Sequence, residues 1–303
     1  METKNNLKAW LYLAPMLILM IVFTFYPLIN AFVISFYKGY LPLGNDGAGS
    51  ITGYTFANYG VILRNQLFWD SIKNTFTLAF VSVPISIIIS LLIAVALKAI
   101  PKLKGFFQTI FFLPYVTNGI AVGMTFAVMF HREYGLFNLV LSWFGIAPMD
   151  WINGGATWWA QMGALMIFTI WESLAFKILV FASGLQNIDK QYYDAAKIDH
   201  ATKWTIFKRI TIPLLSPLIL YISITSMIGA LKAYNSVIGL FGTNLGGQPY
   251  SMITIVAFVY KYRSDFAFEG YYSYAAAAAI ILFFITLVFS LVQTMISKKR
   301  VHY

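Results

Sequence analysis

The sequence has no cysteine among its 303 residues and few charged side chains. The absence of cysteine excludes disulfide bonds, thiolate metal sites and a cysteine nucleophile. The three histidines, His131, His200 and His302, are too scattered to suggest a metal site. Only 11% of the residues are charged, whereas soluble domains average about 25%. With 59% hydrophobic residues and a mean hydropathy of +0.73, this composition excludes a soluble globular domain and predicts an all-α, membrane-embedded bundle.

The net charge of +10 raises the question of a nucleic-acid partner. Proteins that bind nucleic acid through basic patches gather their lysines and arginines on one soluble face. Here the basic residues instead separate long apolar runs. We therefore expect no nucleic-acid partner, and we interpret the charge as a determinant of membrane topology.

Six runs of the sequence are long and apolar enough to cross a bilayer, which takes about 20 residues in a helix. The prediction is thus a polytopic protein with six transmembrane helices in a single domain covering residues 1–303. The predicted spans are residues 9–36, 74–97, 106–130, 158–184, 213–241 and 274–296.

The basic residues predict which side of the membrane each loop occupies. Thirteen lysines and arginines lie in the terminal segments and in the second and fourth loops, against six in the longer loops of the other side. Lysine-dense short loops are typical of the cytoplasmic side. We therefore expect both termini, and the fourth loop, to be cytoplasmic.

Small residues within the spans predict where helices pack closely. Ser82, Ser86, Ser90 and Ala94 recur at intervals of four and so share one face of the second span. Gly119 and Gly123 form a G-x-x-x-G pattern in the third. Such residues let helix backbones approach in lipid, so we interpret both patterns as packing signals.

Two charges inside spans need a different explanation, because each costs about 2.5–3.5 kcal/mol on insertion scales. Glu172 lies near the middle of the fourth span and Lys232 lies beyond the middle of the fifth. One interpretation is a buried structural ion pair between them, with Lys177 reaching to the cytoplasmic surface. The other is a solute path, because hydroxyl, amide and aromatic side chains recur at helical spacing around both charges: Thr169, Ser173 and Phe176 near Glu172, and Asn235 near Lys232.

The longest predicted cytoplasmic loop, residues 187–213, favours two short helices joined by a sharp turn. Asp189 is the expected N-cap of the first helix. Residues 202–210 follow as an amphipathic helix, and Pro213 comes just after it. Helices that carry aromatic and small residues away from a membrane are suited to docking another protein.

This loop resembles the EAA loop of ABC importer permeases, whose pattern is Glu-Ala-Ala, three residues, Gly, nine residues, Ile, one residue, Leu-Pro. The corresponding residues, four of them identical, are Asp194, Ala195, Ala196, His200, Ile210, Ile212 and Pro213. Histidine replaces a glycine that would serve the turn in a left-handed conformation. Histidine adopts that conformation more readily than most residues.

Other segments are similar to the sugar-permease branch of that family, the maltose-type and glycerol-phosphate-type subunits: Leu113-Pro114-Tyr115, residues 135–138 and residues 243–249. The resemblance covers nearly the whole chain. It implies the fold of a type I ABC importer permease core, in the compact six-span form, in a bacterial cytoplasmic membrane.

The resemblance also implies partners. Two homologous permeases, here expected to form a heterodimer, would make one path; two cytoplasmic ATPases would dock at the EAA loops, and an external solute-binding protein would deliver a carbohydrate. The chain has no P-loop, so ATP and Mg²⁺ would bind the ATPases, and this chain would hold no cofactor and catalyse no reaction. The residues assigned to coupling are Asp194, Ala195, Ala196, Asp199, His200, Ala201 and Pro213.

The family's substrate contacts, carried over to the fourth and fifth spans, fall mainly on the polar faces described above. Glu172 is added to these contacts because of its charge. The predicted path residues are then Thr169, Glu172, Ser173, Phe176, Leu231, Lys232 and Asn235. The function implied is import of a carbohydrate, an oligosaccharide by preference, while Lys232 leaves open an anionic sugar or sugar phosphate. The alternative belongs to a different class of transporter: an ion-coupled secondary carrier that uses Glu172 and Lys232 as an ion relay. A membrane enzyme is the weakest of the three hypotheses, since no arrangement of catalytic residues is evident in the sequence.

Overall fold

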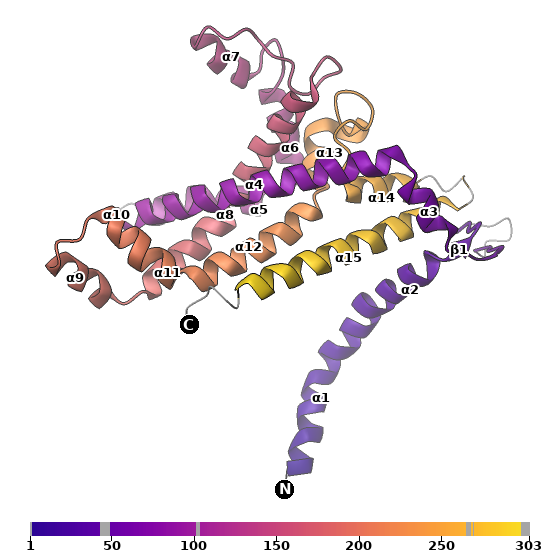
Figure 1. The fold of residues 1–303 in the computed structure, drawn as a ribbon, viewed down its shortest axis with the longest axis horizontal. Helices are drawn as coiled ribbons and strands as arrows, with labels where there is room; N and C mark the ends of the chain where they lie inside the picture. Colours follow the sequence, from indigo (N-terminus) through magenta and orange to yellow (C-terminus); the bar gives the residue numbers. More distant parts are fainter. Residues whose placement is uncertain (1, 43–48, 101–103, 265–267, 269, 298–303) are drawn as a thin grey trace. The chain divides into compact units, whose positions relative to one another are not determined.

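The structure is a computed structural model that describes the chain except for residues 1, 43–48, 101–103, 265–267, 269 and 298–303. The described chain is almost entirely helical, as Figure 1 shows. Its longer helices are α1 (Glu2–Met20), α2 (Tyr26–Ile34), α4 (Gln66–Lys98), α5 (Lys104–Val116), α6 (Gly119–Met129), α8 (Trp158–Asn187), α12 (Ser216–Leu231), α14 (Ile255–Ser264) and α15 (Tyr271–Ser297). The shorter elements are β1 (Tyr37–Lys38), β2 (Gly53–Tyr54), α3 (Ala57–Leu63), α7 (Leu136–Trp143), α9 (Lys190–Ile198), α10 (Lys203–Ile206), α11 (Ile212–Leu214), α13 (Asn235–Phe241), the π-helical turns η1 (Ile21–Phe25) and η2 (Phe207–Thr211), and the 3₁₀ turn η3 (Gly242–Asn244).

Length and hydropathy identify the helices that can cross a membrane. Among the residues that the structure describes, four helical stretches are long and apolar enough, and two bent pairs raise the number to six if each pair is one span. The four are Lys8–Ile34, Gln66–Lys98, Trp158–Asn187 and Tyr271–Ile296; the bent pairs are Gly105–Val116 with Gly119–Met129, and Lys203–Leu214 with Ser216–Leu231. The predicted all-α, polytopic architecture is confirmed.

The chain divides into two compact units, where the sequence predicts one domain. The first contains residues 1–68 and 258–284, and the second contains residues 69–257 and 285–303. In the first unit β1 and β2 pair in antiparallel fashion. The Asn58 amide holds this hairpin to the end of α2 by donating to the carbonyl oxygens of Ser35, at 2.8 Å, and Tyr37, at 2.9 Å.

The core of the second unit forms where α4, α8 and α12 pack together. One cluster of buried residues at this contact contains Leu91, Ala94, Phe181, Ala182, Leu185, Leu215 and Ile222. The predicted packing face of the second span is buried, since Ser82, Ser86, Ser90 and Ala94 are each at most 2% exposed. Ala94 packs in the buried cluster, where a small side chain allows α4 to lie close to its neighbours, whereas Ser82 and Ser86 line the cavity described below.

The predicted third span is broken, because Asn118 starts a new helix inside the apolar run. Asn118 has an extended backbone, and its side-chain oxygen accepts from the amides of Ile120, at 2.9 Å, and Ala121, at 3.3 Å. This N-cap satisfies the first amides of α6. Helices α5 and α6 meet at an angle of 100°.

The predicted fifth span is interrupted as well. The run that ends at Leu214 turns by 67° into α12, where Pro217 stands in the first turn; proline cannot donate a backbone hydrogen bond but suits a helix start. Helix α12 ends at Leu231, and α13 begins at Asn235. The predicted span 213–241 therefore contains more than one helix.

Helices α6 and α13 approach each other at two glycines. A Cβ added to Gly123 would lie 2.7 Å from the Cα of Gly239. A Cβ added to Gly239 would lie 3.1 Å from the Cα of Gly123. The G-x-x-x-G pattern thus provides a backbone contact at Gly123, while Gly119 serves a separate purpose described below.

Candidate functional site

A cavity of about 380 Å³ opens in the second unit, among α4, α5, α8, α12 and α13. Its size falls within the usual range for small-molecule sites. Its lining is rich in hydroxyl groups and also contains one carboxylate, one ammonium group and two aromatic rings. The lining residues are Ser82, Val83, Ser86, Tyr115, Thr169, Glu172, Ser173, Phe176, Lys177, Thr225, Ser226, Gly229, Ala230, Ala233 and Ser236.

The predicted path residues separate into two groups. Those of α8, namely Thr169, Glu172, Ser173 and Phe176, line the cavity together. Those around the end of α12 do not: Leu231 is fully buried in the core, while Lys232 and Asn235 are exposed. The cause is the end of α12, which removes these positions from the helical face that the sequence predicts.

The Glu172 carboxylate lies against the beginnings of two helices. A Cβ on Gly119, the first residue of α6, would come within 2.5 Å of the Glu172 Oε1 atom. The hydroxyl of Ser236, near the start of α13, donates to Oε2 over a long distance of 3.4 Å. A helix start carries partial positive charge. Glu172 thus lies beside the start of α6, where Gly119 leaves the space for its carboxylate.

An ion pair between Glu172 and Lys232 was one expectation. In the described parts of the chain, neither Glu172 nor Lys232 forms an ion pair. Lys232 closes the last turn of α12, where its amide donates to the carbonyl oxygen of Gly229. The structural ion-pair interpretation is therefore wrong.

Lys177 is the second charge of the cavity, and the sequence interpretation misplaced it. Its side chain does not reach to the cytoplasmic surface but is 4% exposed. The ammonium group donates to the hydroxyl of Ser86 on α4, and to that of Ser173 on α8 at 3.0 Å. Lys177 thus joins two helices at the wall of the cavity.

Sequence reasoning also missed the lining residues outside α8. Ser82 and Ser86 were recognised as one helical face, but their spacing cannot tell a packing face from a cavity wall. Tyr115 stacks on Phe176 with ring centroids 5.8 Å apart and planes 21° apart. That pair joins α5 to α8, and such a contact between separate helices leaves no periodic signal.

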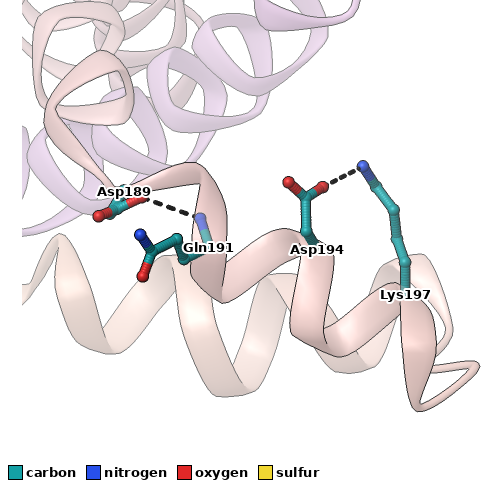
Figure 2. A network of polar contacts seen from close by, with 4 residues as sticks. All are labelled: Asp189, Gln191, Asp194 and Lys197. Carbon is teal, nitrogen blue, oxygen red and sulfur yellow. Dashed lines mark hydrogen bonds and ion pairs between the residues drawn. The ribbon is translucent and has the colours of Figure 1, made fainter.

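The loop at 187–213 forms two short helices, α9 and α10, at one end of α8 (Figure 1). Asp189 is the N-cap of α9, as expected, and accepts from the amide of Gln191 at 2.9 Å (Figure 2). Lys197 donates to Asp194 at 2.7 Å, and Figure 2 draws this contact as well. This hydrogen bond and the charge of Lys197 lower the pKa of Asp194. Both side chains are more than 60% exposed, so the pair adds little to stability.

The turn between the two helices has the left-handed geometry expected at His200, whose φ is +52°. The amide of His200 donates to the carbonyl oxygen of Lys197, and that of Ala201 donates to the carbonyl oxygen of Ala196. These two bonds form a Schellman motif, the usual end of a helix at a left-handed residue. Thr202 then caps α10.

The predicted coupling residues mostly face solvent. Asp194, Ala195, Asp199 and His200 are exposed, Ala201 and Pro213 are half-buried, and Ala196 is buried. Large apolar side chains surround them: Ile198 is 78% exposed and Trp204 is 68% exposed. This combination of small and large apolar groups suits a docking surface.

We predict that His200→Gly stabilises this turn. A left-handed conformation costs a residue with a Cβ roughly 1–2 kcal/mol, and glycine removes that cost. Amide hydrogen exchange at Ala201 should slow by about fivefold, which corresponds to about 1 kcal/mol. His200→Ala is the matched control, because alanine keeps the Cβ and should gain nothing. Equal protection in both variants would contradict this explanation.

Comparisons with known proteins match the chain along nearly its whole length. The family described as "Binding-protein-dependent transport system inner membrane component" matches residues 48–302. The lactose transport system permease protein LacF of Rhizobium radiobacter is 32% identical over 97% of this chain and 95% of its own length. The arabinooligosaccharides transport system permease protein AraP of Bacillus subtilis is 30% identical over 95% and 88%, respectively.

The fold is also similar to a solved structure. A chain in the crystal structure of a bacterial ABC transporter involved in the import of the acidic polysaccharide alginate superposes with a TM-score of 0.81. The match covers 98% of this chain and 97% of that chain. Sequence identity is 20%, so the likeness concerns the fold alone.

Proposed function

The chain belongs to the binding-protein-dependent transport system inner membrane components, the permease subunits of ABC transporters, and we propose on this basis that it imports an oligosaccharide. A permease is a multi-pass membrane subunit and not itself an enzyme; ATP binds its ATPase partners. Relatives named for lactose and for arabinooligosaccharides support a carbohydrate substrate.

The cavity supports the substrate class by its chemistry. Sugars present hydroxyl groups at their edges and C–H groups on their faces. The stacked rings of Tyr115 and Phe176 offer an apolar surface, while Thr169 and Ser173 on α8 offer hydroxyl groups. We propose that these residues and Glu172 form this chain's part of the solute path. Lys232 and Asn235 contribute where that path continues against a second permease; Leu231, fully buried, serves packing.

The assembly that we propose contains a second, homologous permease, two cytoplasmic ATPases and an external solute-binding protein, in a bacterial cytoplasmic membrane. Both termini and the α9–α10 loop face the cytoplasm, in keeping with the clustering of basic residues there. The loop then seats on an ATPase through the surface around Asp194, Ala195, Asp199, His200 and Ala201. Closure of the ATPase pair would move this rigid loop and thereby the spans.

Replacing Phe176 by alanine tests the proposed path. Loss of the stacked ring should raise the KM for uptake of a labelled oligosaccharide by about tenfold, equivalent to about 1.4 kcal/mol. The measurement uses the assembled complex in proteoliposomes, with its binding protein outside and ATP inside. Phe106→Ala is the matched control, since Phe106 is 63% exposed and does not line the cavity. An unchanged KM in Phe176→Ala, or equal effects of both substitutions, would contradict the proposed path.

A further inference from the structure

We infer that Lys177 binds an anionic group of the solute, so that the imported oligosaccharide is acidic and carries a carboxylate or sulfonate. This inference rests on the proposed role of the cavity as the solute path, and it names the chemical class of solute. It depends on the hydrogen bonds of Lys177, on the absence of an ion-pair partner for it among the described residues, and on two hydroxyl groups that have no partner.

The ammonium group of Lys177 has a donor left over for the cavity. An ammonium group carries three N–H donors, and two of them go to Ser86 and Ser173. Both serine hydroxyls already donate to backbone carbonyls, Ser86 to Val83 and Ser173 to Ile170, each at 2.9 Å. The serines can therefore only accept from Lys177, and they bring no negative charge to it.

Lys177 has no ion-pair partner in the described part of the chain. No carboxylate of a described residue lies within 4.0 Å of the Lys177 ammonium group. Glu172 lines the same cavity, but its two oxygens lie at the start of α6 and at Ser236. A buried charge without a counter-charge is costly. An anion entering the cavity would supply the missing partner.

Two further hydroxyl groups of the lining lack a partner. In the part of the chain that the structure describes, the oxygens of Ser82 and Thr169 are buried and form no hydrogen bond. Ser82 precedes Ser86 by one turn of α4, and Thr169 precedes Ser173 by one turn of α8. The two free hydroxyls therefore lie one turn away from the two that hold Lys177. Buried polar groups rarely stay unpaired, and this arrangement fits a ligand with one acidic group and neighbouring hydroxyls.

The test compares acidic and neutral forms of the same sugars. The assembled complex in proteoliposomes is offered trimers of galacturonate and of glucuronate, their methyl esters, maltotriose and a sulfonated sugar. We expect ATP-driven uptake of an acidic probe. Lys177→Gln should raise the KM for that probe by about ten- to a hundredfold, the range of a lost charge-assisted bond, and leave any neutral probe unchanged. Lys177→Arg, which keeps the charge, should retain part of the uptake.

Lys73→Gln is the matched control. Lys73 is an exposed lysine of α4 whose ammonium group lies 4.6 Å from the ring centre of Trp158, outside the cavity. Size-exclusion chromatography shows whether each variant still assembles. ATP-driven uptake of neutral sugars alone, with no effect of Lys177→Gln, would overturn the inference and leave the proposed function standing. The absence of ATP-driven uptake for every sugar would overturn both.

Discussion

Reversing the charge at Asp194 should abolish most ATP-driven uptake while the protein still folds and assembles. Asp194 is exposed, and its partner Lys197 lies on the same face of α9. A lysine at position 194 would place three positive charges together there, at 190, 194 and 197. If this face seats on the ATPase, uptake should fall by about 5- to 150-fold, the usual range of an energetic coupling between sites.

The control for Asp194→Lys is Glu133→Lys. Glu133 is an exposed acidic residue in the segment between α6 and α7, so the change in net charge is the same. Uptake should be normal in that variant, and thermal unfolding should be nearly unchanged in both. Normal uptake in Asp194→Lys with unchanged ATP dependence would remove the coupling role from this loop.

Substituting Gly123 by alanine should destabilise the crossing of α6 and α13. The added methyl group would stand 2.7 Å from the backbone of Gly239, so one of the two helices must move. Overpacking of this kind costs about 1–3 kcal/mol. The thermal unfolding midpoint of the purified complex should drop accordingly. Because α13 carries Ser236 to the cavity, solute affinity should fall as well.

Gly105 provides the comparison for Gly123. It is a glycine of α5, and a Cβ there would meet nothing within 4 Å. Gly105→Ala should stabilise the helix slightly, by about 0.5–1 kcal/mol. Equal unfolding midpoints for Gly123→Ala and Gly105→Ala would mean that the close approach of the two helices does not matter.

The helical spans could be predicted because lipid leaves the backbone few choices. Within a bilayer a single span must be helical, so apolar length alone locates α4, α8 and α15. The turn at His200 was predictable for a different reason. His200 stands at the glycine position of the EAA pattern, where the turn requires a left-handed residue. Both predictions rest on local constraints that the sequence carries by itself.

The breaks in the spans were harder to predict. Asn118 followed by Gly119 is a recognisable helix start, but the surrounding apolar run conceals it. The end of α12 has no such signal, because Ala230, Leu231 and Lys232 all favour helix. Tertiary packing decides that end, and it moves Lys232 and Asn235 away from the face that periodicity predicts.

In the cavity, too, contacts within one helix could be predicted from the sequence, whereas contacts between helices could not. Thr169, Glu172, Ser173 and Phe176 were identified correctly as one face because α8 is a single unbroken helix. The environment of Lys177 could not be deduced in this way. Its partner Ser86 lies 91 residues earlier in the sequence, and only the packing of α4 on α8 brings them together.

If this chain imports a sugar with energy from ATP bound by its partners, uptake must depend on ATP and not on an ion gradient. The most direct test measures ATP hydrolysis and sugar uptake in the same proteoliposomes, with all ion gradients collapsed. We expect uptake to require hydrolysable ATP and no ion gradient, and we expect Asp194→Lys to lose both uptake and its coupling to ATP hydrolysis. Uptake that follows an imposed ion gradient without ATP would contradict this expectation.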